Sequence, residues 1–362
     1  MKNERLRRPS VLIAAIAATA ILVAACSSGT GSAAPSTAAS AGASAAASSG
    51  AATSSGPAVV TQGGALNLDY ATYNPLSLVI KDQGWLEKGL EAQDVTVNWI
   101  KSAGSNKANE ALRANAIDVG STAGSAALLA RSNGSPIQVI DIYSQPEWAA
   151  IVVPKDSTIK SVADLKGKKI AATKGTDPYF FLLQALEEAG LKPEDVTVEV
   201  LQHADGWAAL QNGSVDAWAG LDPIMAGAEQ AGASLLFRNV AFNSYGFLNA
   251  TETFLEKSPD LAQLVVNAYE KARAWALENT EETAAILAEV AGIDIAIATA
   301  VIADRTNLGV DPVPGQAQVD VLEIIGPIFV ESGDVASQQQ IDDALETLLE
   351  PTYAEAADPD AL

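Results

Sequence analysis

The chain has 362 residues, with 44 Asp and Glu against 22 Lys and Arg, one His and one Cys. Its net charge of −22 argues against nucleic acid as a partner, because a phosphate-binding surface needs clustered Lys and Arg. The single Cys excludes an intrachain disulfide and a cysteine-rich zinc or iron–sulfur site. The single His excludes a two-histidine metal site, and we expect neither a metal nor a cofactor. This length predicts two lobes or domains.

Residues 1–25 have the pattern of an export signal. Four basic residues within the first eight precede an almost entirely apolar stretch, 11–23, which is too short to span a bilayer. The stretch ends in Val23-Ala24-Ala25-Cys26, which resembles the lipobox of bacterial lipoproteins. The resemblance implies that Cys26 is lipidated and anchors the protein to the outer face of the cytoplasmic membrane. An ordinary secretory peptide with a chance Cys is the alternative.

Residues 26–64 are predicted to form a disordered tether. Ser27 to Ala58 contains only Ala, Ser, Gly, Thr and Pro, a composition that cannot bury enough apolar surface to offset its ordering entropy. As a flexible coil it reaches about 30 Å. Cleavage removes four basic groups and one acid, so the mature net charge is −22 − 3 = −25. We expect a strongly acidic body held just off a membrane.

The remainder alternates strand and helix patterns. Residues 66–70, 95–99 and 196–200 alternate with a period of two, which predicts strands. Residues 178–189 form a helical pattern closed by glycine, and Ser258-Pro259 opens a long helix towards Asn279. Strands separated by helices indicate an α/β fold with parallel sheets, followed by a mostly helical C-terminal part.

A short internal repeat predicts two lobes with one plan. Ala111-Leu112, four residues, and Ile117-Asp118 match Ala209-Leu210, four residues, and Val215-Asp216, at an offset of 98. In both copies a helical pattern runs into a turn, a strand and a second helix. Two similar lobes facing each other would place a cleft between them.

Four strand-to-helix turns are candidate anion sites. They are Asn74-Pro75, Asp177-Pro178, Asp222-Pro223 and the turn 120–125. Asn or Asp suits the N-cap position and Pro the first helical position. Helix N-termini carry free N–H groups and partial positive charge. Each turn alone is most often only a cap, and recurrence in both lobes favours a ligand site.

At these residues the chain resembles solute-binding proteins of ABC importers, in the aliphatic-sulfonate, taurine and nitrate group. The matching segments are 116–124, 162–171, 174–176 and 215–223, and the resemblance extends from about 66 to 335. It implies a two-lobed type II periplasmic-binding-protein fold that closes around a ligand. The implied boundaries are 65–150 and 247–340 for lobe one, 151–246 for lobe two, and 341–362 for a C-terminal helix and tail. The crossovers would lie near 152–154 and 243–245.

The resemblance implies a monomeric lipoprotein receptor that delivers a small organic anion, such as a sulfonate, to the permease of an ABC importer. Enzymes that share the fold depend on Cys, which is absent after Cys26, so we expect no enzymatic activity. Two alternatives stay open. One is a receptor for nitrate, bicarbonate or an aromatic heterocycle. The other is a surface-tethered scaffold or adhesin without a small ligand.

The site residues expected from the resemblance lie at the strand-to-helix turns. Asp177 either caps its helix or meets a ligand amine, and His203 is expected at the surface. An oxyanion would be held by N–H and hydroxyl donors on one side, with aromatic and acidic groups opposite. The predicted ligand-binding residues are Tyr73, Asn74, Ser121, Thr122, Gly175, Thr176, Asp177, Trp218 and Asp222.

Overall fold

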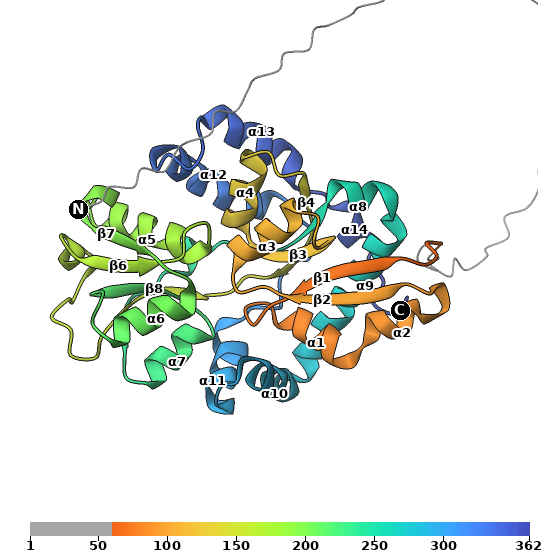
Figure 1. Cartoon of the computed structure of the whole chain (residues 1–362), viewed down its shortest axis with the longest axis horizontal. Helices are drawn as coiled ribbons and strands as arrows, with labels where there is room; N and C mark the ends of the chain where they lie inside the picture. Colours follow the sequence, from red (N-terminus) through yellow and green to blue (C-terminus); the bar gives the residue numbers. More distant parts are fainter. Residues whose placement is uncertain (1–59) are drawn as a thin grey trace, which may run out of the picture. The chain divides into compact units, whose positions relative to one another are not determined.

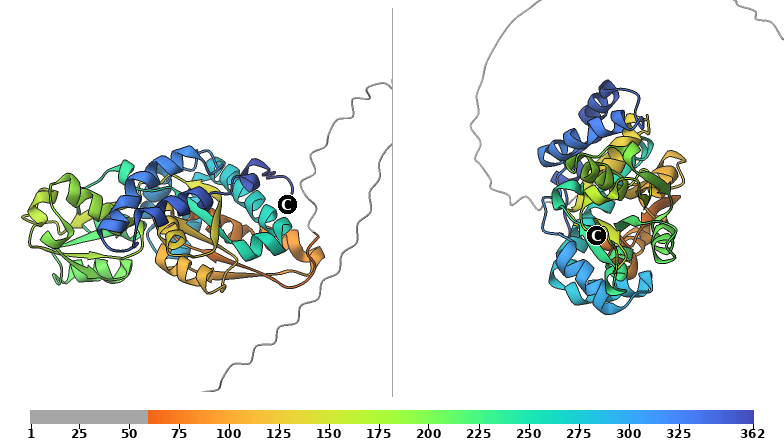
Figure 2. Two further views of the ribbon diagram at one scale, coloured as in Figure 1. Left: turned by 90° about the horizontal axis from the view of Figure 1, so that it is seen from above. Right: turned by 90° about the vertical axis from the view of Figure 1, so that its left-hand side faces the viewer.

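The computed structural model describes residues 60–362, which belong to one compact unit (Figures 1 and 2). The predicted signal, Cys26 and most of the predicted tether lie outside the described residues. Two five-stranded sheets carry the fold, with strand orders β2-β1-β3-β10-β4 and β7-β6-β8-β5-β9. The predicted two-lobed α/β architecture is confirmed, with one sheet at the centre of each lobe.

The two sheets follow one plan. In lobe one, β1 pairs in parallel with β2 and β3, and β10 runs antiparallel to β3 and β4. In lobe two, β6 pairs in parallel with β7 and β8, and β5 runs antiparallel to β8 and β9. The strands are β1 (Ala65–Tyr70), β2 (Thr96–Lys101), β3 (Val119–Ala123), β4 (Ile137–Ser144), β5 (Ala149–Val153), β6 (Lys169–Ala172), β7 (Thr197–Val200), β8 (Ala217–Leu221), β9 (Ser234–Phe237) and β10 (Gly246–Thr251).

The aspartates of the internal repeat make equivalent hydrogen bonds in the two lobes. Asp118 Oδ2 accepts a hydrogen bond of 2.8 Å from the N–H of Asn67 in β1. Asp216, 98 residues later, accepts one of 2.9 Å from the N–H of Lys169 in β6. Each aspartate directly precedes the middle strand of its sheet, β3 or β8, and ties it to the neighbouring parallel strand, β1 or β6. The repeat in the sequence therefore corresponds to a repeat in the structure.

Helices cover both faces of each sheet. In lobe two, α5 lies on one face of the sheet and α6 on the other (Figure 1). Besides short 3₁₀ turns, a π-helical turn spans Val301–Arg305. The α-helices are α1 (Pro75–Gln83), α2 (Trp85–Leu90), α3 (Ser105–Arg113), α4 (Gly124–Ser132), α5 (Asp177–Glu188), α6 (His203–Gln211), α7 (Ile224–Gln230), α8 (Glu252–Lys257), α9 (Pro259–Glu278), α10 (Thr280–Ala291), α11 (Ile295–Ala300), α12 (Gln316–Glu331), α13 (Gln338–Leu348) and α14 (Thr352–Glu355).

The chain crosses between the sheets twice. The first crossover runs from the end of β4 at Ser144 to the start of β5 at Ala149, because β5 already belongs to the sheet of lobe two. The prediction that this crossover lies near residues 152–154 was therefore wrong by a few residues, because Val152 is already within β5. The second runs from the end of β9 to the start of β10 and includes Ser244.

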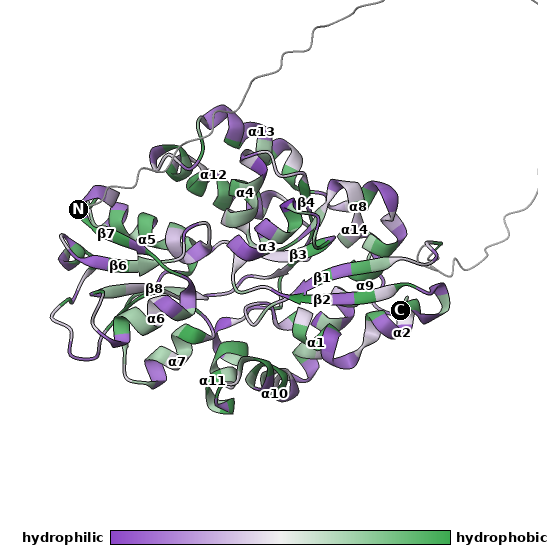
Figure 3. Cartoon of the chain, viewed as in Figure 1, coloured by the Kyte–Doolittle hydropathy of each residue, from purple (hydrophilic) through white to green (hydrophobic). Residues whose placement is uncertain are grey.

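The largest buried cluster joins the two lobes. It runs from Leu66 and Tyr143 in lobe one through Trp148 in the first crossover to Phe180 and Phe181 on α5. Hydrophobic residues follow the strands and the helix faces packed on them, and hydrophilic residues cover much of α2 and α13 (Figure 3). A second cluster fills lobe two between β8 and α6.

Candidate binding cleft

A cleft of about 350 Å³ lies between the lobes. Its walls are the loops that follow β1 and β2 in lobe one and β7 and β8 in lobe two, closed by the turn between α10 and α11. Ligands of open parallel sheets bind beyond the carboxyl ends of the strands, so this is the place where a solute would touch both lobes. The lining residues are Thr72, Tyr73, Lys101, Ser102, Ala103, Gln202, His203, Ala204, Leu221, Asp222, Pro223, Ile224, Ala291 and Ile293.

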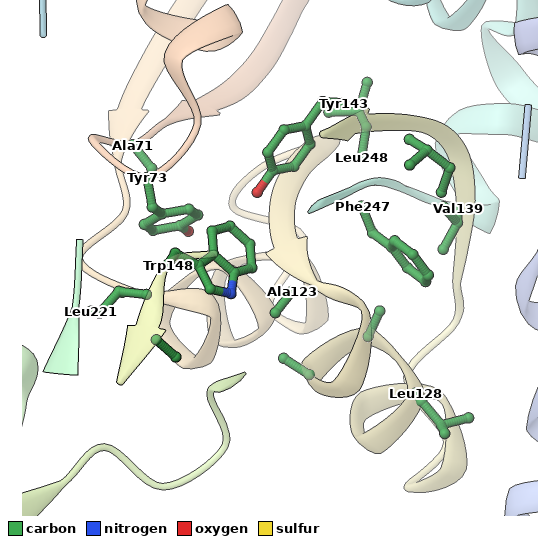
Figure 4. Packing of buried hydrophobic residues seen from close by; sticks show 14 of the residues in the cluster. Ala71, Tyr73, Ala123, Leu128, Val139, Tyr143, Trp148, Leu221, Phe247 and Leu248 are labelled. Atoms are coloured by element: carbon green, nitrogen blue, oxygen red, sulfur yellow. The ribbon is translucent and has the colours of Figure 1, made fainter. Parts of the chain in front are cut away.

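Tyr73 forms a rigid aromatic wall on the lobe-one side. Its hydroxyl donates a hydrogen bond of 3.0 Å to the carbonyl of Ser121, and its ring meets Trp148 edge to face at 6.1 Å (Figure 4). Burial, together with the nearby carboxylate of Asp69, raises the pKa of Tyr73 well above its usual value. The phenol is therefore neutral and held in place, as an apolar surface for a solute requires.

A buried carboxyl lies behind this wall. Asp69 accepts hydrogen bonds from the Ser121 N–H at 2.9 Å and from the Ser121 hydroxyl at 3.1 Å. Burial raises the pKa of Asp69 to about 7, against the hydrogen bonds from Ser102 and Ser121, which lower it. Ser102 lines the cleft and hydrogen-bonds to Asp69, so it connects this carboxyl to the cleft wall.

Asp222 is the acidic group of the lobe-two wall. Its Oδ1 accepts from the Ala226 N–H at 2.9 Å, within the first turn of α7, and from Arg305 Nη1 at 3.2 Å. Burial raises the pKa of Asp222 to about 6, and the Arg305 charge acts in the opposite direction. Arg305 also pairs with Glu229, so this cation bridges the two lobes rather than facing the cleft freely.

His203 lies in the lobe-two wall, and the expectation that it is a surface residue was wrong. Only 2% of the residue is exposed, because it sits at the first position of α6 against lobe one. Nδ1 lies 3.2 Å from Thr173 Oγ1, and Nε2 has no hydrogen-bond partner within residues 60–362. Burial lowers the pKa of His203 to about 4.

Asp177 connects the lobes through the hinge. Its Oδ1 accepts from the hydroxyls of Ser125 and Ser244, each at 2.6 Å. Its Oδ2 accepts from Trp148 Nε1 and from the Ser244 N–H, each at 2.8 Å. Burial raises the pKa of Asp177, and these donors lower it. Every donor comes from lobe one or a crossover, so Asp177 is neither only a cap nor free for a ligand amine in this arrangement.

The predicted hydroxyl donors have partners inside the protein. Ser121 lies within β3 rather than in the turn after it, and its N–H and hydroxyl are used by Asp69. Thr122 donates to the Ala123 carbonyl and accepts from Asn249. Both are fully buried and outside the lining of the cleft. Their contact with an oxyanion stays a prediction.

Three further predicted residues also lie away from the cleft. The Thr176 hydroxyl donates to the Thr173 carbonyl at 2.6 Å. Gly175 borders a separate hollow of about 250 Å³ beside α3 and α4. Asn74 is the N-cap of α1, since its Oδ1 accepts from the Ser77 N–H, and its Nδ2 donates to the Tyr269 hydroxyl.

Trp218 packs in the core of lobe two instead of the cleft wall. The residue is fully buried, its ring lies 6.0 Å from Trp207, and a Cβ atom at Gly206 would lie 2.7 Å from it. The glycine on α6 therefore makes room for the indole. Of the predicted ligand-binding residues, Tyr73 and Asp222 line the cleft.

The cleft residues at the ends of β2 and β7 were not among the predicted site residues. Lys101 ends β2 and Ser102 follows it, and Gln202 and His203 follow β7. Both strands were recognised by their alternation, and the rule that ligands bind beyond strand ends applies to them as well. These turns carry neither Asx-Pro nor Gly-Ser signals, so the sequence did not mark them as ligand sites.

Between residues 60 and 362, none of the helices combines the length and apolar character needed to cross a membrane. The same residues hold no group of three His, Cys, Asp or Glu side chains arranged for a metal ion.

Comparison with known proteins identifies relatives over most of the described chain. Residues 78–283 match the family described as NMT1/THI5 like. A relative from Escherichia coli (strain K12), named as an aliphatic sulfonates-binding protein, is 31% identical over 262 residues, which are 72% of this chain and 81% of that one.

Solved structures show the same architecture. The periplasmic aliphatic sulphonate binding protein SsuA from Escherichia coli is 28% identical with a TM-score of 0.67, covering 79% of this chain and 92% of that one. The alkanesulfonate-binding protein SsuA from Xanthomonas axonopodis pv. citri, bound to MOPS, has a TM-score of 0.71 at 24% identity, covering 79% and 99%. At that identity the second likeness concerns the fold alone.

Proposed function

Because the chain belongs to the NMT1/THI5-like family, we propose that it is the solute receptor of an ABC importer and binds an organic sulfonate between its lobes. The observation that carries the proposal is the cleft of about 350 Å³, to which both lobes contribute the carboxyl ends of parallel strands. The names of the relatives support a sulfonate as the solute class.

The composition of the cleft fits an organic anion. Lys101 brings a positive charge to its wall, and no carboxylate of the described chain lies within ion-pair distance of it. The carboxyl of Asp222 is compensated by Arg305. Tyr73 and Leu221 offer apolar surface for a carbon chain. Charges that lie farther from the solute than a Debye length of about 8 Å are largely screened, so the groups that line the cleft affect binding more than the net charge of −22 does.

The wider role follows from the same proposal. We place the lipid on Cys26, the protein at the outer face of the cytoplasmic membrane as a monomer, and the permease of the importer as its partner. We further propose that the chain is a receptor without catalysis. The relatives named above are binding proteins, and the sequence has no Cys after Cys26 to serve as a nucleophile.

Thermal denaturation against a solute panel tests the proposal. A solute that binds only the folded chain raises its stability by RT ln(1 + [L]/Kd), about 2.7 kcal/mol at 100-fold excess over Kd. We expect short alkanesulfonates to raise the melting temperature, with calorimetry giving one site per chain. If only nitrate, bicarbonate or an aromatic heterocycle does so, the sulfonate assignment is wrong. If no solute does so, the scaffold alternative is favoured.

A further inference from the structure

His203 is the one histidine of the chain, and its hydrogen bonds determine which ring nitrogen carries the proton. Thr173 Oγ1 donates its single proton to the Leu201 carbonyl at 2.7 Å. The same oxygen lies 3.2 Å from His203 Nδ1, so it accepts there, and Nδ1 carries the hydrogen. In a neutral imidazole this leaves Nε2 as a bare acceptor. Burial lowers the pKa of His203 to about 4, so the ring is neutral at pH 7.

That acceptor is buried and unpartnered in the wall of the cleft. Among residues 60–362, Nε2 has no hydrogen-bond partner, and it faces lobe one so closely that a Cβ at Gly104 would lie 3.0 Å away. Gln202 Oε1, on the neighbouring lining residue, is a second buried acceptor without a partner in this part of the chain. A buried polar atom without a partner costs about 1–3 kcal/mol. A solute that brings a hydrogen-bond donor would relieve this cost, whereas an oxyanion would be repelled by the lone pair of Nε2.

We infer that His203 Nε2 accepts a hydrogen bond from the solute, so that the cleft selects sulfonates bearing an N–H or O–H group over plain alkanesulfonates of the same size. This inference rests on the proposed function. The anionic end of such a solute belongs near Lys101, which lines the cleft from the lobe-one side. The solute would then join a cation on one lobe to an acceptor on the other, and its donor would enter where Nε2 now lies against Gly104.

Three isosteric probes separate the two ends of the solute. They are 2-aminoethanesulfonate, 2-hydroxyethanesulfonate and propane-1-sulfonate, in which a methyl group replaces the donor. Calorimetry on the full-length protein should give at least ten-fold tighter binding for 2-aminoethanesulfonate, since a hydrogen bond involving a charged group is worth about 1.5–3 kcal/mol. For 2-hydroxyethanesulfonate, whose hydroxyl is neutral, a hydrogen bond worth about 0.5–1.5 kcal/mol predicts roughly two- to ten-fold tighter binding. His203→Phe should abolish this preference, so that the three probes bind the variant with affinities within about three-fold of one another.

Nitrogen NMR provides a readout that needs no variant. A protein without a polyhistidine tag has one imidazole, so its two ring-nitrogen signals belong to His203. We expect the Nδ1–H tautomer at pH 7 in the free protein, and a changed Nε2 signal on addition of 2-aminoethanesulfonate. Thr173→Val removes the oxygen that holds Nδ1–H and should allow both tautomers, with a smaller preference for the donor-bearing probes.

The outcomes separate this inference from the proposed function. Equal affinity for all three probes, or an Nε2–H tautomer in the free protein, would overturn the inference and leave the receptor intact. Propane-1-sulfonate affinity that rises about ten-fold per pH unit on acidification, with a proton taken up by the imidazole, would show His203 binding as a cation and would also overturn it. Failure of all three probes to bind would overturn the proposed function and the inference together.

Discussion

The Ser125 hydroxyl, in the first turn of α4, donates a 2.6 Å hydrogen bond to Asp177 Oδ1 at the first residue of α5. This bond joins lobe one to lobe two beside the crossovers, away from the lining of the cleft. The sequence predicted that Asp177 either caps its helix or meets a ligand amine. In the structure residues 178–181 are buried within α5, and the Asp177 carboxylate ties the two lobes together.

We predict that Asp177→Ala destabilises the protein by about 2–4 kcal/mol, because buried donors of Ser125, Ser244 and Trp148 lose their acceptor. Urea denaturation measures the loss. Asp82→Ala, which removes an exposed carboxylate from α1, should change stability by less than about 0.5 kcal/mol. If the stability of Asp177→Ala is unchanged but binding of 2-aminoethanesulfonate is lost, the structural role is wrong and Asp177 contacts the ligand.

Gly104→Ala should weaken solute binding about ten-fold and should also lower the stability of the free protein, because φ at Gly104 is +157°, a backbone conformation that side chains rarely adopt. The added Cβ would lie 3.0 Å from His203 Nε2 across the boundary between the lobes, so it would keep the lobes apart. Scattering with saturating solute should show a larger radius of gyration than for the wild type. Gly190→Ala is the matched control, because its φ of +71° also strains a side chain while its Cβ would meet nothing within 4 Å. Equal affinities for Gly104→Ala and the wild type would contradict close approach at this point.

Arg305→Met is expected to cost about 3–5 kcal/mol, because the buried carboxylate of Asp222 loses its counter-charge. The pKa of Asp222, already raised to about 6 by burial, should rise further. Adding Asp222→Asn should recover much of the loss in a double-mutant cycle. Arg238→Met removes a more exposed ion pair with Glu147 and should cost no more than about 1 kcal/mol. Equal losses in the two arginine variants would refute the difference in burial as the cause.

Asp69→Asn should change how stability depends on pH. Burial raises the folded pKa of Asp69 to about 7 from 3.8, so between these values the folded state binds more protons than the unfolded state. The wild type therefore loses stability as pH rises from about 4 to about 7, by up to about 4 kcal/mol. Asn does not titrate, so the free energy of unfolding of the variant should increase relative to that of the wild type as the pH rises from about 4 to about 7. The titrations of His203 and Asp222 contribute to the pH dependence of both proteins alike, so they largely cancel in the comparison. Parallel stability curves from urea denaturation at pH 4 and pH 8 would count against the shift.

Cys26→Ala should release the protein from the membrane fraction of a bacterial host, since Cys26 is the only thiol and ends the short apolar segment. Cell fractionation and the molecular mass of the wild-type N-terminus measure the anchor. A cleaved Cys26→Ala protein that stays in the membrane fraction would exclude lipidation as the cause of attachment.

Features that depend on neighbouring residues were predictable from the sequence. The Asn74 cap bonds to Ser77 three residues away, and the strands β1, β2 and β7 follow from their alternation. The repeat at an offset of 98 predicted two lobes, and Asp118 and Asp216 hold equivalent strands. Each signal is local, because capping and alternation depend on residues within a few positions.

The cleft itself was decided by tertiary structure. Every side chain of β8 is buried, so alternation could not tell that Trp218 faces α6 rather than the cleft. Asp177 finds its acceptor role with Ser125 and Ser244, which are 52 and 67 residues away. His203 became a buried acceptor only because lobe one lies against it at Gly104. Burial removes water as the alternative partner, and which groups lose it depends on how the two lobes meet.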